Sequence, residues 1–381
     1  MKSTETVEIR TENLINILKS KPWKEGEFKK QNWGVWLHRM SPYVGRIKPS
    51  FAHWLIKLFS ETNQTILDPF CGIGTIPLEG SLLGRRVIGI DLNPYAVAIS
   101  KAKFDRRGLK NELEYLSNIK INLEDIDLSK VPDKIKEYYH PKTLKEIIAL
   151  RNLFLKDNRY FLLGCLLAIS HGHRQTQHLS IRTGYIIPYL PNPRPPKEYR
   201  EVIPRLIKKV IRMYKDDFPL EINEEIYEAD SRNLPLKDSS VDVVITSPPY
   251  YDTLDYASYN FLRLGLLKLD RFDIEGLKND LIQDKKTYLE DMRKVALEIK
   301  RVLKNDSFCV LVLGDVNKGN LIINTAEEVE KVYKELGFKI LGIVDDEIPK
   351  EKTTIAKFGG KEGITKKKIK LDRILIMINK K

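Results

Sequence analysis

Short apolar runs separated by amphipathic stretches predict a sheet of buried strands near both ends of the chain. β-Branched runs such as RVIGI at 86–90 and VDVVI at 241–245 have the length of strands. Similar runs occur at 65–67, 225–229, 307–316, 338–348 and 369–379. Helical spacing of apolar residues lies between them, for example over 287–303 and 324–337. Because such strands alternate with helices, the pattern predicts an α/β fold with a mostly parallel sheet.

Between residues 106 and 220 the alternation of strands and helices is replaced by helical patterns alone. Two helices are expected at 142–157 and 160–170, and the proline-rich stretch IIPYLPNPRPPKEY follows them. We interpret this region as a helical insertion that interrupts the α/β part. The expected division is an N-terminal segment at 1–60, a first α/β part at 61–105, the insertion at 106–220 and a second α/β part at 221–381.

Composition narrows the class of protein. The chain of 381 residues is 42% hydrophobic, and neither a membrane span of roughly 18–20 apolar residues nor a secretory signal is evident, so a cytoplasmic location is expected. Its three cysteines are far apart in the sequence and predict neither disulfides nor structural zinc. The net charge of +13 favours a polyanionic partner, although abundant Lys and Glu with few Met and Cys are also typical of a thermophile.

Glycines and acids follow the first strands in a pattern typical of a nucleotide-like ligand site. Gly72 and Gly74 come just after the strand at 65–67, where a chain that bends around a ligand needs residues without Cβ. Asp91 ends the next strand and is placed to accept the hydroxyl hydrogens of a ribose. Asp230 follows the third strand and is placed to reach an adenine amino group. A structural turn and surface carboxylates would account for each feature taken alone.

The segment TSPPYY at 246–251 forms a second candidate site. Two prolines cannot continue a strand, so the strand at 241–245 ends near Thr246 and a rigid loop follows at its carboxyl end. Ligands of open α/β sheets bind at such ends, whereas a tight surface turn is the structural alternative.

Four segments resemble successive motifs of the S-adenosylmethionine-dependent methyltransferases that modify exocyclic amines of nucleic-acid bases. They are DPFCGIGT, GIDLNP, EADSRNLP and TSPPYY. The resemblance covers the α/β parts, roughly two-thirds of the chain. It implies a Rossmann-like, seven-stranded class I methyltransferase sheet whose last strand is antiparallel, with the helical insertion over its carboxyl edge.

The resemblance also implies S-adenosylmethionine as the cofactor and assigns residues to it. The first motif would hold the methionine and sugar portions, Asp91 the ribose, and Asp230 would lie near adenine. HRMSPYVGRIKPSF is similar, more loosely, to the motif that covers the cofactor's carboxylate end. The cofactor-binding residues expected from the resemblance are Asp68, Phe70, Gly72, Gly74, Asp91 and Asp230.

A base amine is a weak nucleophile because its lone pair is delocalised into the ring, so acceptors must hold its hydrogens while it is aimed at the methyl group. Ser247 Oγ and the Pro248 carbonyl are the expected acceptors, and Tyr250 is expected to stack on a base rotated out of its helix. These three form the predicted catalytic set. Tyr251, Asp255 and Tyr256 would shape the target pocket, although packing explains Tyr256 equally well.

The insertion contains a cluster of His and Arg in SHGHRQTQHLSIRTGY. No cysteine or acid lies nearby in the sequence, so no metal site is expected, and contact with substrate phosphates is the functional interpretation. The residues chosen for it are His171, Arg174 and Arg182. A polar turn that binds only water or backbone would give the same pattern.

Serine as the first residue of the amine-binding loop favours cytosine N4 in this family, whereas Asp or Asn is common for adenine N6. The insertion follows the second strand, whereas the related DNA enzymes carry their target-recognition segment immediately before the amine-binding loop. We therefore predict cytosine-N4 methylation, with structured RNA such as ribosomal RNA slightly favoured over DNA. The alternatives are a site-specific DNA cytosine-N4 or adenine-N6 methyltransferase, a tRNA guanine-N2 methyltransferase and an inactive nucleic-acid-binding subunit.

Overall fold

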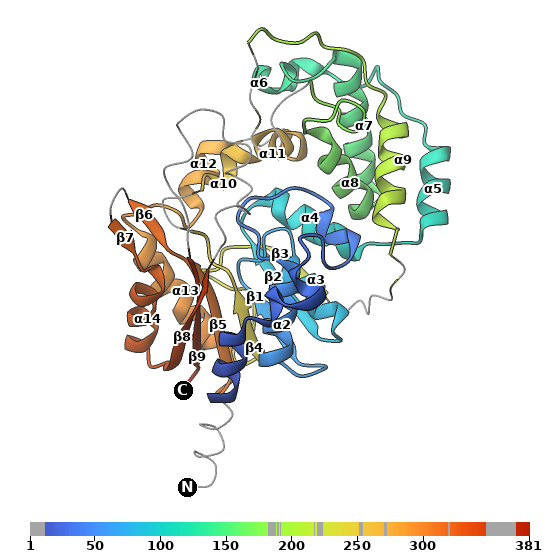
Figure 1. Ribbon diagram of the computed structural model, residues 1–381. Coiled ribbons are helices and arrows are strands. Elements are labelled where there is room, and N and C mark those ends of the chain that lie inside the picture. The colour runs from blue at the N-terminus through green and yellow to red at the C-terminus, as the bar shows by residue number, and fades with distance from the viewer. Residues whose placement is uncertain are drawn as a thin grey trace.

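Seven strands form one mixed sheet in the order β3-β2-β1-β4-β5-β9-β8. The computed structural model describes residues 12–181, 188, 190, 192–216, 218, 224–250, 254–269, 273–318, 321–347 and 371–381. The strands are β1 (Thr65–Asp68), β2 (Arg86–Asp91), β3 (Glu224–Glu228), β4 (Val243–Thr246), β5 (Phe308–Gly314), β8 (Lys339–Glu347) and β9 (Leu371–Ile378). Their positions agree with the apolar runs of the sequence (Figure 1).

The strand directions confirm the predicted sheet. β1 to β5 run parallel to their neighbours, whereas β9 runs antiparallel to both β5 and β8. A hairpin of β6 (Val316–Lys318) and β7 (Leu321–Ile323) follows β5 and was not predicted. Its signal was the Gly-Asn pair at 319–320, a typical two-residue connection between short strands.

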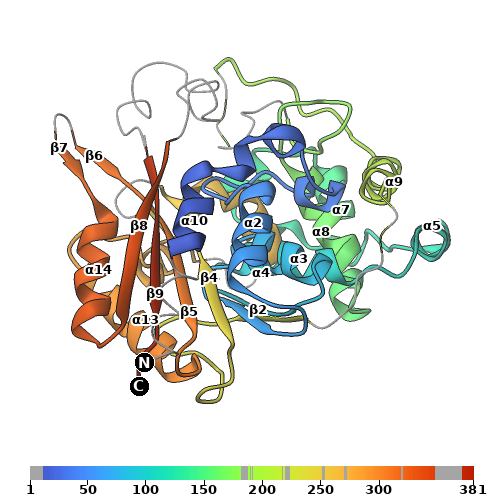
Figure 2. The ribbon, with the colours of Figure 1, turned by 60° about the horizontal axis from the view of Figure 1, so that its bottom comes forward.

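Helices cover both faces of the sheet, which explains why its strands are almost continuously apolar. Ile66 and Val243 face one side of the sheet and pack with α2 (Pro49–Phe59). Leu67 and Val244 face the other side and pack with α13 and α14, whose bounds are given below. Figure 2 shows α14 on one side of the strands and α2 and α3 on the other. The helices are α3 (Thr75–Leu82) and α4 (Pro94–Phe104) beside α2, and α13 (Tyr288–Val302) and α14 (Thr325–Glu335) opposite them.

The N-terminal segment lies against α2 and the β8 end of the sheet. The ring of Trp23 lies 4.5 Å from that of Phe51, and its Nε1 donates a hydrogen bond to Asp346 at 3.2 Å. A helix over residues 12–20 begins the described part of this segment. Three short helices follow it: η1 (Pro22–Lys24), η2 (Gly26–Lys29) and η3 (Trp36–Arg39). These contacts tie the start of the described chain to α2 and to strand β8 near its end.

The helices between α4 and β3 share one hydrophobic core with α4. They are α5 (Leu109–Asn118), α6 (Asp133–Lys136), α7 (Pro141–Lys156), α8 (Tyr160–Ser170) and α9 (Val202–Met213), with η4 at Leu128–Lys130. The buried helix α8 packs closely on α4 through Gly164, where a Cβ would lie only 2.4 Å from the Cβ of Ala102. The insertion is therefore packed against the helical layer and does not have a separate core (Figure 1).

Three further helices follow the TSPPYY segment: α10 (Tyr256–Tyr259), α11 (Phe261–Leu267) and α12 (Ile274–Asp280). Helix α11 contacts α4, α7 and α8, so it joins the region after the TSPPYY segment to the insertion. None of the helices in the described residues is long and apolar enough to cross a membrane.

Candidate active site

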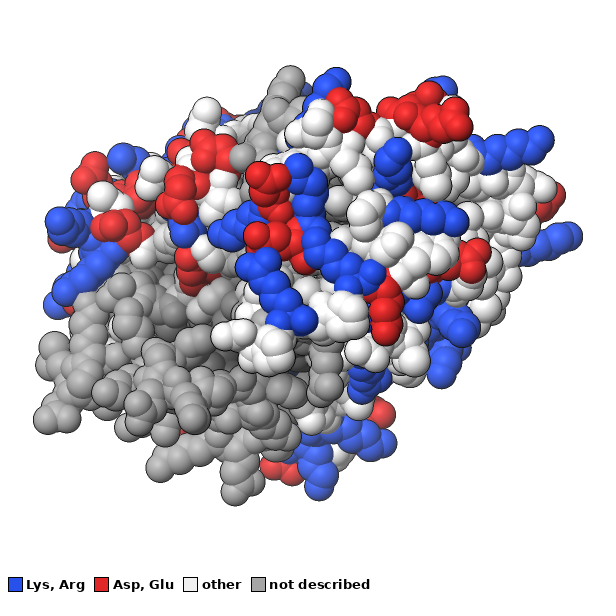
Figure 3. Space-filling model, turned by 90° about the horizontal axis from the view of Figure 1, so that it is seen from above, with Lys and Arg blue, Asp and Glu red and all other residues white. Residues whose placement is uncertain are grey.

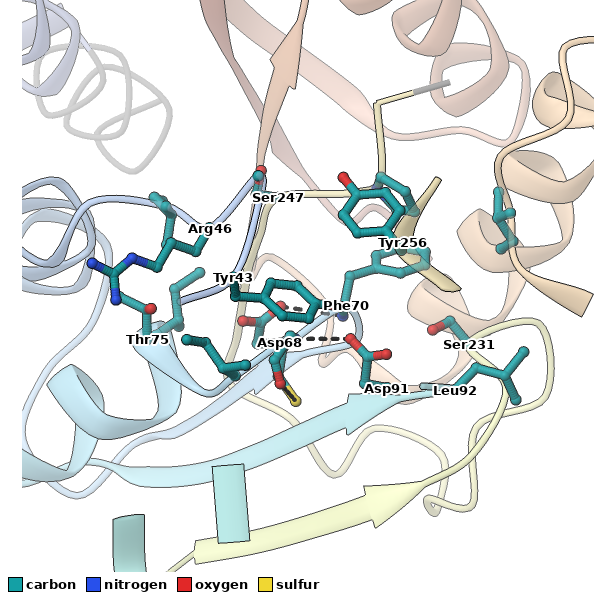
Figure 4. Close-up of a pocket in the computed structure, with 18 of the residues that line it drawn as sticks. Tyr43, Arg46, Asp68, Phe70, Thr75, Asp91, Leu92, Ser231, Ser247 and Tyr256 are labelled. Carbon is teal, nitrogen blue, oxygen red and sulfur yellow. Dashed lines mark hydrogen bonds between the residues drawn. The ribbon is translucent and has the colours of Figure 1, made fainter. Parts of the chain in front are cut away.

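A cavity of about 790 Å³ opens at the carboxyl ends of β1, β2 and β4. Strand order reverses between β1 and β4, and crevices at such switch points are the usual ligand sites of open α/β sheets. Asp68, Asp91 and Ser247 all line this cavity, so the predicted cofactor and amine sites lie at the same edge of the sheet (Figure 4).

The turn after β1 depends on its glycines. Gly72 and Gly74 have φ angles of +52° and +71°, which disfavour residues with a side chain. A Cβ on Gly74 would also lie 2.3 Å from Ser100 Oγ of α4. Beneath the turn, the buried Lys103 donates from Nζ to the Gly74 carbonyl at 3.1 Å. Burial lowers the pKa of Lys103 to about 7.

Asp91 holds the backbone on both sides of the cavity floor. Its Oδ2 accepts a hydrogen bond from the Gly72 amide at 2.8 Å, and its Oδ1 accepts one from the Asn93 amide at 2.8 Å. Burial raises the pKa of Asp91 to about 6, although these backbone hydrogen bonds oppose the rise. The carboxylate thus fixes the glycine turn and faces the space that a ligand would occupy.

Asp68 connects the end of β1 with the end of β4 at the cavity. Its Oδ1 accepts hydrogen bonds from the Thr246 hydroxyl at 2.6 Å and from the Phe70 amide at 3.2 Å. Burial raises the pKa of Asp68 to about 7. Because Thr246 immediately precedes Ser247, this bond fixes the start of the amine-binding loop relative to the end of β1.

The loop after β4 presents a hydroxyl oxygen at the cavity wall. Ser247 Oγ donates to the Val312 carbonyl of β5 at 3.2 Å, which leaves the oxygen's lone pairs for another donor. Pro249 lines the cavity together with Ser247, whereas Pro248 is buried. Tyr250 Oη donates to Asp372 Oδ1 on β9 at 3.2 Å, so the phenol is attached to the antiparallel strand.

Two tyrosine rings form a wall that the sequence did not single out as a pair. Tyr43 and Tyr256 are stacked with centroids 6.1 Å apart and an interplanar angle of 28°. The chain approaches Tyr256 closely at Gly45, where a Cβ would lie 2.9 Å from the tyrosine Oη. Figure 4 shows both rings above the two aspartates. Tyr43 and Arg46 belong to HRMSPYVGRIKPSF, which predicted a covering segment without indicating which side chains enter the cavity.

The covering segment is tied to the helix that follows the glycine turn. His38 Nε2 lies 2.6 Å from Glu79 Oε1, and His53 Nδ1 lies 3.0 Å from Glu79 Oε2. Both His38 and Glu79 are buried. The position of Tyr43 relative to the cavity is therefore coupled to α3.

Comparison with known proteins agrees with this geometry. A family model described as "DNA methylase", for N6 and N4 methyltransferases, matches residues 9–102. The type II methyltransferase M.MjaII of Methanocaldococcus jannaschii is 23% identical over an alignment of 411 positions that covers 78% of this chain and 78% of that protein. The chain is thus similar to the N4/N6 amino-methyltransferases. It is a methyltransferase that uses S-adenosylmethionine to modify amines of nucleic acids.

Two further similarities cover different shares of the methyltransferase. An uncharacterized RNA methyltransferase of Caldanaerobacter subterraneus is 33% identical over 90 residues, which cover 23% of this chain and 20% of that protein. The crystal structure of a SAM-dependent methyltransferase from Methanosarcina mazei covers 86% of this chain and 97% of that chain, at 12% identity and a TM-score of 0.37. A likeness of that size adds nothing to the fold assignment, which depends on strand order.

The cavity fits the family's cofactor, which supplies an electrophilic methyl group on a sulfonium when bound. The positive-φ glycine turn allows close approach of a ligand to backbone. Asp91 would accept from the ribose hydroxyls, and Asp230, also in the cavity wall, would lie near adenine. Asp230 additionally accepts from the Arg232 guanidinium at 2.7 Å, which fixes the carboxylate. Phe70 and Arg46 contribute an apolar surface and a cation.

The residues expected to contact substrate have different outcomes. Tyr256 lines the cavity, whereas Asp255 caps α10 by accepting from the Ser258 amide at 2.9 Å. The prediction for His171 is wrong, because it follows the buried helix α8 and is itself wholly buried. Arg174 is exposed and stays a prediction. Tyr251 and Arg182 lie outside the described residues.

The placement of the insertion over the carboxyl edge of the sheet stays a prediction, but the described part of the insertion does not form the cavity wall. Among the described residues, none between 106 and 220 lines the cavity. Residues Tyr256, Leu281 and Ile282, which follow the amine-binding loop in the sequence, form that wall instead. No group of three or more His, Cys, Asp or Glu in the described part of the chain is arranged to hold a metal.

The cofactor affinity is expected to rise with pH. Burial raises the pKa of Asp91 to about 6, so this group is protonated in acid and accepts hydroxyl hydrogens best above that value. Calorimetric titration with S-adenosylmethionine between pH 5 and pH 8 measures the effect, and the affinity should level off above about pH 7.

The unliganded enzyme should show the opposite trend. Because burial raises the pKa values of Asp91 and Asp68, the folded state binds more protons than the unfolded state between about pH 4 and pH 7. The contribution of these groups to the free energy of unfolding therefore decreases as pH rises through that window.

For the first of these two predictions, a cofactor affinity that is constant over pH 5–8 would contradict the role given to Asp91.

Tyr250 is expected to act through its ring and to be positioned by Asp372. Tyr250→Ala should lower kcat/KM because the stacking surface is lost, and the expected loss of transition-state stabilisation is about 1–3 kcal/mol. Tyr250→Phe retains the ring and should cost about 0.5–1.5 kcal/mol by losing the hydrogen bond to Asp372. Steady-state kinetics with Asp372→Asn and the double variant complete the cycle. Additive losses in Tyr250→Phe/Asp372→Asn would show that the two side chains act independently.

Proposed function

We propose that this methyltransferase transfers a methyl group to the exocyclic N4 amine of cytosine in a polynucleotide. The observation that carries the proposal is the position of Ser247 at the cavity wall, with its hydroxyl hydrogen directed to the Val312 carbonyl. Its oxygen is thereby an acceptor, and serine at this position of the loop favours cytosine in the resembling family.

The chemistry requires two acceptors near the amine nitrogen. Ser247 Oγ would take one amine hydrogen and the Pro248 carbonyl the other, which favours the pyramidal nitrogen whose lone pair is available for transfer. The held nitrogen would receive the methyl group that the bound cofactor supplies, and the proton that the nitrogen then loses would pass to solvent. Proline at 248 and 249 keeps the loop rigid and reduces the entropy lost when the base is aimed.

The target base would enter between the amine-binding loop and the tyrosine wall. Tyr256 and Tyr43 offer ring surfaces on one side of the cavity, and Tyr250 follows the acceptors directly. Enzymes that modify base atoms generally bind the base outside its helix, where both its faces can stack. The three aromatic residues around Ser247 support such a binding mode.

DNA is our first candidate for the polymer. The matching family model is described as "DNA methylase", and the relative that covers 78% of this chain is named a type II methyltransferase. Structured RNA is the second candidate and stays the prediction of the sequence. It is favoured by the similarity to an RNA methyltransferase over 23% of the chain.

The test is methyl transfer from radiolabelled S-adenosylmethionine to genomic DNA and, separately, to total RNA from a strain that lacks this gene. Nucleoside chromatography then identifies the product. N4-methyldeoxycytidine is the expected result, and N4-methylcytidine would select the second candidate. Label in N6-methyladenine or N2-methylguanine would overturn the cytosine assignment, and a protein that binds cofactor without labelling either polymer would overturn the proposed activity.

A further inference from the structure

The distribution of charge indicates which part of the enzyme approaches the polynucleotide. Residues 106–220 contain 22 Lys and Arg but only 13 Asp and Glu, so this region carries most of the net charge of +13. The surface itself gives no simple stripe: Figure 3 shows Lys and Arg beside Asp and Glu on the face seen from above. A binding site is therefore better sought where cations meet a cavity.

Such a place exists between the insertion and the catalytic part. A second cleft, with a volume of about 890 Å³, lies between α4, α7, α8 and the end of α11. Its floor is apolar, with Val97, Ala98, Leu163 and Leu267 each at most 7% exposed. Tyr160 supplies an aromatic ring at its wall. An apolar floor with an aromatic wall is suited to a planar ring.

Three cations from three different helical segments line the same cleft: Lys101, Arg151 and Lys268. Lys101 Nζ lies 5.6 Å from the centre of the Tyr160 ring. Arg151 donates from Nη2 to the Leu267 carbonyl at 2.5 Å, which holds the guanidinium at the end of α11. The cleft thus combines a surface for stacking with positive charge, as single-stranded nucleic-acid sites do.

One carboxylate in the cleft opposes this charge. Glu228 lies at the end of β3 and accepts from Lys268 Nζ at 2.9 and 3.2 Å. The two side chains are 43% and 39% exposed, so the ion pair is accessible to solvent and to a competing anion. A phosphate bound at Lys268 would have to displace or share this partner.

The cleft is close enough to the active site for one strand to reach both. Pro94, which begins α4 in the cleft, follows Asp91 and Leu92 of the first cavity by a few residues. On the other side, α10 and α11 lead from Tyr256 in the first cavity to Leu267 in the second. That path is on the order of 17 Å at 1.5 Å per helical residue, which corresponds to a few nucleotides.

We propose that this cleft is a second substrate site that binds a nucleotide flanking the target base on the same strand. Its base would lie on the apolar floor beside Tyr160, and its phosphate would contact Lys101 and Lys268. The proposal rests on the proposed function, because that function places the target base of the same strand at Ser247. It also gives the insertion a role in substrate binding that does not require its residues to line the catalytic cavity.

The test measures binding without catalysis. Fluorescence anisotropy would follow a labelled 16-nucleotide single-stranded DNA of mixed sequence with one central cytosine, and an RNA of the same sequence. Lys101→Met and Lys268→Met are each expected to weaken binding about 3- to 10-fold and to lower the dependence of log affinity on log salt by about one. Glu228→Gln should strengthen binding, because it removes the opposing charge.

A matched ion pair far from the cleft provides the control. Lys304 Nζ lies 2.6 Å from Asp242 Oδ1 near the amino ends of β4 and β5, so Lys304→Met removes a comparable paired lysine. It should leave binding nearly unchanged. Equal weakening by Lys304→Met and Lys268→Met, or wild-type binding in both cleft lysine variants, would overturn the proposal. Thermal unfolding of each variant establishes that it is folded.

Abasic substitution locates the bound nucleotide. Removing the base at one position flanking the cytosine should weaken binding by wild-type enzyme and should have less effect on Lys101→Met, because both changes disrupt one contact. Equal effects at every position in both proteins would also overturn the proposal. These results do not depend on methyl transfer, so a protein that fails the labelling assay can still show the cleft site, and an active enzyme can still lack it.

Discussion

Asp91→Ala should weaken cofactor binding about 100-fold, which corresponds to about 2.7 kcal/mol. The carboxylate would contact the ribose hydroxyls and also holds the amides of Gly72 and Asn93 at 2.8 Å. Its removal leaves two amides without a charged acceptor, so the glycine turn loses its fixed shape at the same time. Titration calorimetry with S-adenosylmethionine measures the change directly.

Two further variants separate binding from a general loss of structure. Asp91→Asn keeps one acceptor oxygen and should lose less affinity than the alanine variant. Asp238→Ala removes a surface carboxylate that pairs with Arg301 and should bind cofactor normally. A folded Asp91→Ala protein with wild-type affinity would refute the assignment of this residue to the cofactor.

Ser247→Ala should lower kcat about 100-fold while the dissociation constant of the cofactor stays within about twofold of wild type. The hydroxyl oxygen is the proposed acceptor for one amine hydrogen, and this interaction is most valuable when the nitrogen is pyramidal. Since Ser247 donates to the Val312 carbonyl, the substitution also frees that carbonyl at the cavity wall. Single-turnover methyl transfer with saturating cofactor isolates the chemical step.

Ser240→Ala is the matched control for this substitution. Its hydroxyl also donates to a backbone carbonyl, that of Lys237 at 2.7 Å, in an exposed hydrogen bond. Ser240 precedes the amino end of β4, whereas the cavity lies at the carboxyl end of that strand. It should be fully active. If Ser247→Ala retained the wild-type rate, or if it lost cofactor affinity as strongly as turnover, Ser247 would not be the amine acceptor.

The fold could be predicted because its signals are local. The strand at 243–246 is apolar on both faces and ends at prolines, and the glycines after β1 have the positive φ angles that their position implied. The hairpin after β5 was missed because its strands are three residues each and continue directly from a longer strand. Short strands contribute too little periodicity to be separated from their neighbours.

The candidate site was less accessible from sequence because it depends on contacts between distant segments. Nothing local relates Tyr43 to Tyr256, which meet only because the N-terminal segment is fixed to Glu79 on α3. His171 has a side chain of a type that often binds ligands, but it follows a helix that is buried on all sides. Polar type alone does not tell whether a side chain faces solvent, a ligand or the core.

The place of β9 in the sheet affects how the enzyme folds as it is synthesised. Strand β9 lies between β5 and β8, although both precede it in the chain. Until the ribosome has released residues 371–378, the outer edge of β5 has no partner strand. The nascent chain therefore passes through a stage in which a parallel sheet of β1 to β5 ends in an unpaired apolar edge, the kind of edge that invites pairing between chains. Slow translation over residues 348–370 would prolong that stage, so the yield of soluble enzyme should depend on the speed of synthesis there.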